Sequence, residues 1–155
     1  MRDEPLLLRE LESLYREVDA AHEGTTCPRS SECCRFGITG REPQVTSLEL
    51  ALVRRAVRAR GGPLKAERRA LPLQSSHERE GTCPMLDRSG GCTIYAARPL
   101  GCRTFFCDGG EGPRVARADV QRLARAIADL SDRFAPNDPG PRPLSNVSLG
   151  ARARR

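Results

Sequence analysis

Seven cysteines in two groups constrain this chain more than any other feature of its sequence. Four lie in one segment, with eight, nine and four residues between them: Cys83, Cys92, Cys102 and Cys107. The other three lie about fifty residues upstream: Cys27, Cys33 and Cys34. Turn-forming residues surround both groups, a pattern typical of chains that fold around a metal. The sequence therefore predicts a metal-binding protein, without indicating what the metal is for.

The composition favours such a crosslink. A chain of 155 residues has the length of one domain and can bury a core. That core would be thin, because hydrophobic residues make up 38%, aromatic residues 4%, and glycine and proline number 14 and 12. A chain with so little bulky apolar material gains much stability from a metal or a disulfide.

The expected compartment decides between these two crosslinks. Asp3 and Glu4 stand where a signal peptide needs a basic and then an apolar segment. No stretch approaches the roughly 20 apolar residues of a membrane span. We therefore expect a cytoplasmic protein without a membrane partner, whose reduced thiols bind metal or act in catalysis. The odd number of cysteines also disfavours a fully paired disulfide framework.

The net charge of +6 is a weak argument for nucleic-acid binding. Half of the excess falls in residues 135–155, which hold four arginines and one aspartate. The glycine-rich residues 109–112 carry no lysine and follow no strand pattern, which excludes a phosphate-binding loop of the usual kind. We expect a metal ion as the partner and disfavour nucleic acid, and the sequence names no protein partner.

Apolar residues at spacings of three and four predict amphipathic helices over 5–22 and 117–134. Another helix begins with the capping-box pair Thr46 and Glu49 and ends at Gly61-Gly62. A short helix over 64–71 is also compatible with the sequence, and the last long helix should pack on the first. The predicted fold class is mainly α: a small, irregular, metal-supported domain with about three amphipathic helices around a cysteine-rich loop centre. We expect this domain to span 1–134 and the proline- and arginine-rich residues 135–155 to form a flexible tail.

Details of the packing follow from the same patterns. We expect the inner face of the second helix to be Leu48, Leu52, Ala56 and Ala59. Residues 27–45 should be loop or short extended structure, with Phe36 and Ile38 packed beneath it. The two histidines, His22 and His77, are interpreted as a solvent-facing helix-end residue and an exposed loop residue, with metal ligation as the alternative for each.

Thiolates favour zinc, copper(I) and iron-sulfur clusters over hard cations. A structural site needs four ligands, so seven cysteines leave three over or serve more than one metal. The spacing matches neither a zinc ribbon nor a ferredoxin, and buried structural cysteine is the alternative for the whole set. Adjacent Cys33 and Cys34 can reach one centre only if the backbone turns between them.

A family resemblance rests on specific residues. The chain contains Cys83-Pro84-Met85-Leu86, Gly91-Cys92-Thr93-Ile94-Tyr95, Arg98-Pro99 and Gly101-Cys102-Arg103-Thr104-Phe105, preceded by Cys27-Pro28 and Glu32-Cys33-Cys34. Over residues 27–107 it resembles the YkgJ-type cysteine-cluster family of zinc- or iron-chelating domains, named for a CxxCxxCC motif. The resemblance implies zinc or iron as the cofactor, the iron either as an ion or in an iron-sulfur cluster.

The chain departs from that motif at one position. Ser30 stands where the motif has its second cysteine, and serine is a poor substitute for a thiolate. Either this position is not an essential ligand or the site is modified. We favour the first alternative because seven thiols still exceed four.

Structural roles can be predicted for several residues between the cysteines. Ile94 and Tyr95 offer a packing face beside Cys92, and Pro99 fixes a turn that returns the chain towards it. The arginines at 98 and 103 either donate hydrogen bonds to thiolates or carbonyls or pair with an acidic helix.

Three functions remain open. The first is a metal-binding protein in which all seven cysteines converge and at least four bind zinc or iron. The second is a redox or cluster-dependent enzyme, with Cys102 beside Arg103 as a candidate reactive thiol. The third is an interaction or nucleic-acid-binding module in which the metal is structural. The sequence favours the first.

Overall fold

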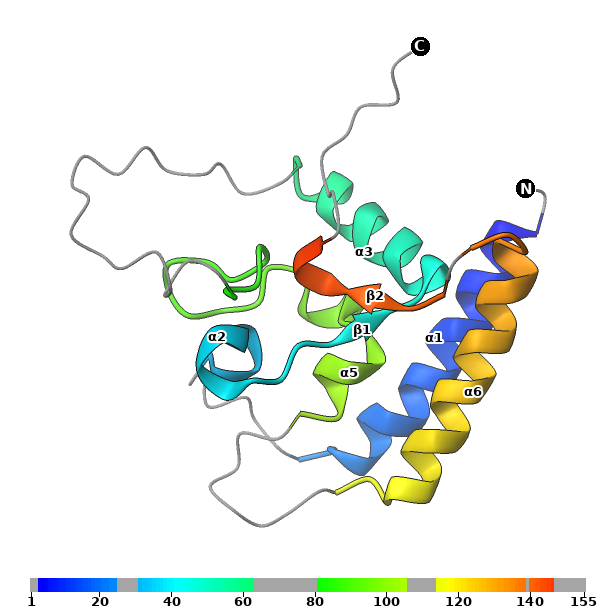
Figure 1. Cartoon of the computed structure of the whole chain (residues 1–155), viewed down its shortest axis with the longest axis horizontal. Helices are drawn as coiled ribbons and strands as arrows, with labels where there is room; N and C mark the ends of the chain where they lie inside the picture. Colours follow the sequence, from blue (N-terminus) through cyan, green and yellow to red (C-terminus); the bar gives the residue numbers. More distant parts are fainter. Residues whose placement is uncertain (1–2, 25–30, 63–80, 106–113, 139, 147–155) are drawn as a thin grey trace.

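The computed structural model describes residues 3–24, 31–62, 81–105, 114–138 and 140–146. Three long helices form one side of the molecule, and we call them the helical platform: α1 (Glu4–Ala21), α3 (Ser47–Ala59) and α6 (Arg117–Phe134). Figure 1 shows α1 and α6 side by side and antiparallel, with the short cysteine-bearing elements on the opposite side. The mainly helical fold class is confirmed.

The first helix follows its leucine pattern. Pro5 lies in the first turn, where a missing backbone N–H costs nothing. The apolar stripe faces the core and contains the buried residues Leu7, Leu8, Leu11, Tyr15 and Val18. The predicted helix over 5–22 is thus confirmed to within one residue at each end.

Helix α3 starts with the predicted capping box. The Thr46 side chain accepts a hydrogen bond from the Glu49 backbone N–H, and the Glu49 carboxylate accepts one from the Thr46 N–H at 2.9 Å. The predicted inner face is right at Leu48 and Leu52 but wrong at Ala59, which is exposed. Val53 and Val57 are buried instead, because the buried stripe includes the bulkier side chains one position along the helix.

Helix α6 packs on α1, as predicted, and also on α3. Its core face is Leu123, Ile127, Leu130 and Ser131. Along the solvent side of the α1–α6 contact, Arg122 pairs with Glu17 at 2.7 Å and Arg133 pairs with Glu10 at 3.1 Å. These pairs are half exposed, so they contribute little beyond the apolar contact beneath them.

The segment after the first helix is more helical than expected. It forms the 3₁₀ turn η1 (Glu32–Cys34), the single-turn helix α2 (Phe36–Thr39) and the short strand β1 (Gln44–Val45). Phe36 is buried as predicted. Ile38 is not: it is 71% exposed, because α2 turns that side chain away from the core that receives Phe36.

Part of the expected tail is packed into the fold. Strand β2 (Arg142–Pro143) pairs antiparallel with β1, with Val45 opposite Arg142. Leu144 opens the 3₁₀ turn η3 (Leu144–Asn146) and is 1% exposed. Over residues 140–146 the structure therefore differs from the expected flexible tail, because the extended backbone that proline favours pairs with a strand edge and delivers one leucine to the core. The extent of the domain beyond residue 146 stays a prediction.

Several sequence expectations lie outside the described residues. They concern Cys27, Ser30, His77, Cys107, the short helix over 64–71 and the glycine-rich residues 109–112. Within the described part of the chain, no helix combines the length and the apolar character needed to cross a bilayer.

Candidate metal centre

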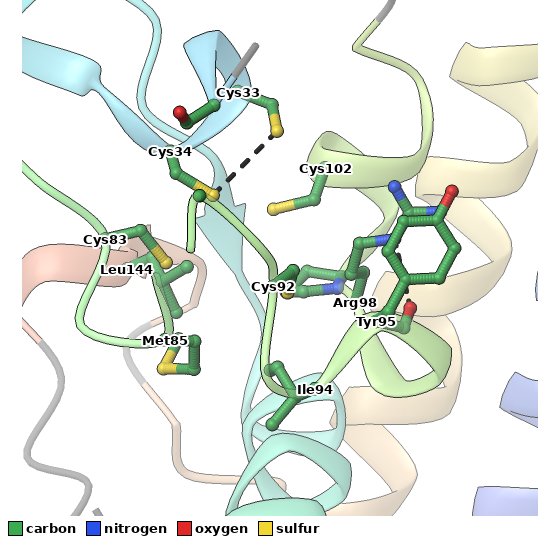
Figure 2. Close-up of a pocket in the computed structure, with 13 residues that line it drawn as sticks. Cys33, Cys34, Cys83, Met85, Cys92, Ile94, Tyr95, Arg98, Cys102 and Leu144 are labelled. Atoms are coloured by element: carbon green, nitrogen blue, oxygen red, sulfur yellow. Dashed lines mark hydrogen bonds between the residues drawn. The ribbon is translucent and has the colours of Figure 1, made fainter. Parts of the chain in front are cut away.

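Five cysteines from separate parts of the chain line one cavity. They are Cys33, Cys34, Cys83, Cys92 and Cys102. Figure 2 shows their side chains around the same space, Cys33 and Cys34 from η1 and Cys102 from α5 (Leu100–Arg103). The cavity volume is about 30 Å³. That is room for an ion and one or two water molecules.

The 3₁₀ turn η1 brings both adjacent cysteines to the cavity. Their sulfur atoms lie 3.8 Å apart, and η1 supplies the backbone turn that was the condition for both to reach one centre. The turn is closed by a hydrogen bond from the Cys34 N–H to the Ser31 carbonyl at 2.9 Å. Ser31 itself has φ 59°, in the left-handed region that non-glycine residues rarely adopt. The structure thus holds a locally costly backbone conformation beside the thiols.

The loop between Cys83 and Cys92 is built from backbone hydrogen bonds. The Cys83 N–H donates to the Cys34 carbonyl at 2.7 Å, which joins the two cysteine groups directly. An isolated antiparallel bridge pairs Leu86 with Cys92. Asp87 closes the tip, since its Oδ1 accepts hydrogen bonds from the Ser89 and Gly91 N–H groups at 2.9 and 2.8 Å. The loop is therefore fixed without an apolar core of its own.

The short helix α5 carries Cys102 to the same cavity. Pro99 precedes it, and the Pro99 carbonyl accepts a hydrogen bond from the Cys102 N–H at 3.0 Å. Gly101 allows α5 to approach β1, because a Cβ at this position would lie 2.9 Å from the Pro43 Cβ. The turn predicted at Pro99 is therefore present, and it brings Cys102 and Cys92 to one cavity.

Apolar side chains complete the wall of the cavity. Met85, Ile94 and Leu144 are buried and line it together with the thiols. Tyr95, which we expected to pack beside Cys92, also lines the cavity but is 48% exposed. The thiols therefore face a largely apolar space, and Tyr95 is the only exposed side chain among its described lining residues.

Burial and mutual proximity set the thiol acidity. The hydrogen bond with Cys33 lowers the pKa of Cys34, but the hydrogen bond with Cys83, burial and the charges of Cys83 and Cys92 together raise it to about 12. Burial, followed by repulsion from the other thiolates, raises the pKa of Cys102, which Arg98 partly opposes. In the metal-free protein these two thiols are neutral at pH 7.

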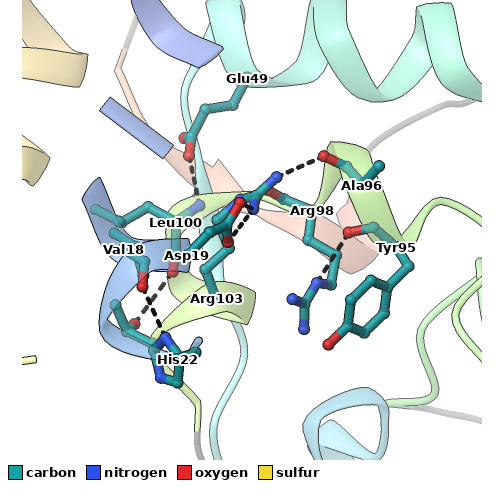
Figure 3. Close-up of polar contacts among 10 residues, drawn as sticks. Val18, Asp19, His22, Glu49, Tyr95, Ala96, Arg98, Leu100 and Arg103 are labelled. Atoms are coloured by element: carbon teal, nitrogen blue, oxygen red, sulfur yellow. Dashed lines mark hydrogen bonds and ion pairs between the residues drawn. The ribbon is translucent and has the colours of Figure 1, made fainter. Parts of the chain in front are cut away.

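Arg103 anchors the cysteine region to the platform (Figure 3). Its side chain is 4% exposed, and one terminal nitrogen donates to both carboxylate oxygens of Asp19 on α1, at 2.5 and 2.6 Å. The other two nitrogens donate to the carbonyls of Ala96 and Arg98, at 2.5 and 2.8 Å. The guanidinium also lies over the Tyr15 ring, 4.2 Å from its centroid. Both roles that the sequence left open for this arginine, carbonyl donor and partner of an acidic helix, are realised.

Glu49 makes a second connection between the same regions. Besides closing the capping box, its carboxylate accepts hydrogen bonds from the Tyr15 hydroxyl at 3.0 Å and from the Leu100 N–H at 2.9 Å. Burial, followed by the charge and hydrogen bond of Glu49, raises the pKa of Tyr15 well above its usual value. One carboxylate therefore joins α1, α3 and the start of α5.

Arg98 follows only one of the two alternatives. Its Nε donates to the Tyr95 carbonyl at 3.0 Å, and its guanidinium lies 3.6 Å from the centroid of the Tyr95 ring. Among the described residues no carboxylate pairs with it. It lines the cavity with the thiols.

The structure also shows what sequence reasoning missed. His22 is half buried at the end of α1, where its Nδ1 donates to the Val18 carbonyl at 2.8 Å, and it does not line the cavity. The sequence pattern at Glu49 indicated only a helix cap, so its partners on α1 and α5 were not predicted. Leu144 had no signal, because it lies in a proline-rich segment.

The donor set fits a soft metal ion. Among the described residues lining the cavity there are five thiols and one thioether, from Met85, and no imidazole or carboxylate. Such sulfur donors suit zinc, copper(I) and iron-sulfur chemistry and not hard cations. In the described part of the chain no three ligand-type side chains are already gathered closely enough to hold an ion. Binding would therefore draw the sulfur atoms closer together.

Comparison with known proteins supplies one finding. Residues 26–119 match the family model CxxCxxCC, described as "Putative zinc- or iron-chelating domain". This match spans both cysteine groups and all five cysteines at the cavity. No curated protein and no solved structure matches the chain significantly.

Proposed function

The chain belongs to the CxxCxxCC family of zinc- or iron-chelating domains, and we propose that its cysteine cluster binds a single zinc or iron ion in the cavity between η1, the 83–92 loop and α5. The observation that carries this proposal is the convergence of five thiols, from stretches far apart in sequence, on one cavity. Cys27 and Cys107, which the sequence analysis also names as candidate ligands, complete the candidate ligand set.

The donors at the cavity suffice for one ion. Five thiols exceed the four ligands that a single zinc or iron ion needs, whereas an iron-sulfur cluster brings several irons and sulfides of its own. Four of the thiols would serve as ligands, and the remainder would line the wall. The bound ion would supply a fixed positive centre that holds these thiols as thiolates.

The proton balance gives the proposal a measurable consequence. Because Cys34 and Cys102 are neutral at pH 7 in the metal-free protein, each must lose its proton to become a ligand. Metal affinity should therefore fall as the pH is lowered, and metal uptake should release protons.

Metal analysis of the full chain, purified without oxygen, tests the proposal. We expect near one zinc or iron per chain, no labile sulfide, and loss of stoichiometric metal in Cys92→Ser and in Cys102→Ser. Thr104→Ser, two residues from Cys102, is the matched control and should keep its metal. Several irons with labile sulfide would replace the single ion by a cluster. Full metal retention in both cysteine variants would refute the site.

A further inference from the structure

The two arginines beside Cys102 differ in what their charged groups contact. Every nitrogen of the Arg103 guanidinium donates to a protein oxygen, on Asp19, Ala96 or Arg98. Arg98 donates only from its Nε, to the Tyr95 carbonyl. No oxygen of the described residues accepts a hydrogen bond from its two terminal nitrogens. The Arg103 guanidinium is therefore fully used within the fold, whereas the two terminal nitrogens of Arg98, a residue that lines the cavity, have no acceptor among the described residues.

The unsaturated arginine is held in a fixed orientation. Its Nε hydrogen bond and its stacking on Tyr95, 3.6 Å from the ring centroid, restrain the plane of the guanidinium. Figure 2 shows the stacked pair at one side of the thiol cluster. Among the described residues that line the cavity only Tyr95 is exposed, at 48%, and we take its side as the open side of the cavity. A restrained fork of donors at an accessible edge is pre-organised for a ligand.

Arg98 lies near the thiols without bonding to them. No hydrogen bond joins it to any of the five thiols that the structure describes at the cavity, although Arg98 and these thiols line the same space. No described carboxylate lines that space either. Arg98 and the candidate metal ligands therefore line one space without a hydrogen bond between them, so that an anion with two acceptor atoms would find a cation and the metal centre on the same cavity.

We propose that Arg98 and Tyr95 form a binding subsite for a small carboxylate at the open side of the thiol cavity. This inference rests on the proposed metal site, since one carboxylate oxygen would face Arg98 and the other the metal centre. A planar carboxylate matches the edge of the guanidinium, the part that Tyr95 leaves uncovered. The small cavity restricts the ligand to a carboxylate with a short or outward-pointing remainder.

Cobalt(II)-loaded full chain and ¹³C-labelled acetate provide the test. Paramagnetic relaxation of the acetate carbons reports their approach to the metal centre, with the zinc-loaded protein as the diamagnetic blank. We expect saturable relaxation by the unmodified chain and at least about ten-fold weaker acetate binding in Arg98→Met, the loss typical of a charged hydrogen bond. Arg98→Lys keeps the positive charge but lacks the paired N–H donors of a guanidinium, so its acetate affinity should lie between those of the unmodified chain and Arg98→Met.

Two further variants separate the subsite from general charge effects. Tyr95→Phe keeps the stacked ring and should bind acetate like the unmodified chain, whereas Tyr95→Ala should bind about two- to five-fold more weakly. Arg41→Met is the matched control, because Arg41 also lies over an aromatic ring, that of Phe105 at 5.9 Å, but does not line the cavity. It should leave acetate binding unchanged.

The outcomes distinguish this inference from the proposed function. Failure of the unmodified chain to take up cobalt would overturn the metal site and the subsite with it. Normal cobalt uptake with equal acetate relaxation in the unmodified chain and Arg98→Met would overturn the subsite alone. Sulfate at matched ionic strength competing as well as formate would overturn the assignment to carboxylates.

Discussion

The helical platform and the cysteine region are stabilised in different ways. The platform buries continuous apolar stripes, such as Leu7 to Val18 on α1, with ion pairs on its exposed rim. The cysteine region, residues 31–36 and 81–105, is fixed by backbone hydrogen bonds and by two buried charged side chains, Glu49 and Arg103, that tie it to the platform. From this difference we expect the platform to be stabilised mainly by apolar burial, and the cysteine region by its connections to the platform and by the proposed metal.

Metal removal should produce the largest difference in stability between the two regions. Binding energies of structural zinc reach on the order of 10 kcal/mol in small domains, and here that energy would be concentrated in the cysteine region. Chelation of the metal-loaded chain should therefore abolish hydrogen-exchange protection of amides such as those of Cys83 and Cys102, while the amides of α1, α3 and α6 stay protected. Equal loss of protection in both regions would show that they form one cooperative unit.

Removal of the Arg103 connection should have the next largest effect. Arg103→Met leaves two carbonyls and Asp19 without their donor, and we expect a loss of about 2 kcal/mol in the free energy of unfolding. The expected loss of stability is limited because Asp19 is 51% exposed, so its carboxylate can hydrogen-bond to water instead. Arg122→Met, which breaks the exposed pairs with Glu17 and Asp119, is the control and should cost clearly less than Arg103→Met. Urea denaturation measures both, and equal losses would contradict the anchoring role of Arg103.

Gly81 tests how closely the two cysteine groups are joined. Its carbonyl accepts a hydrogen bond from the Gly37 N–H at 3.1 Å, and a Cβ at Gly81 would lie 2.5 Å from that nitrogen. Because φ is also +112°, Gly81→Ala should cost about 2–3 kcal/mol and weaken metal binding. Gly40→Ala is the matched control: φ is +64° with open space around it, so about 1 kcal/mol is expected from the backbone alone. Thermal unfolding and metal titration of both variants decide whether the close contact matters.

The same contrast explains how much could be predicted from the sequence. The platform was predictable because spacings of three and four and a capping box are local signals, and they placed α1, α3 and α6 correctly. The family was recognisable from residues around Cys92 and Cys102, and the family match confirms it. The connections were not predictable, since Glu49 meets partners 34 and 51 residues away that no local pattern specifies. The ligand set of the metal stays a prediction.

The β1–β2 pair joins the platform and the cysteine region. The carboxylate of Asp138 should make the stability of this part of the fold weakly dependent on pH. The Asp138 carboxylate accepts hydrogen bonds from the Ser47 hydroxyl, at the start of α3, and from Arg142 on β2. The Ser47 hydrogen bond, followed by the hydrogen bond and charge of Arg142, outweighs partial burial and lowers the pKa of Asp138. These contacts help to hold the segment that places Leu144 at the cavity wall.

Asp138→Asn should therefore destabilise the protein by about 1 kcal/mol at pH 7. A carboxyl group whose pKa is lower in the folded than in the unfolded state stabilises the fold above its unfolded pKa, which is about 4. This contribution is lost as the pH falls through the folded pKa. The stability difference between the unmodified chain and Asp138→Asn should thus be constant down to about pH 5 and shrink below pH 4. Asp132→Asn, an exposed change of the same charge on α6, is the control. Acid is expected to remove the proposed metal from all three proteins alike, so only the difference between them carries the argument. A difference that stays constant to pH 2 would contradict the role of the ionised carboxylate.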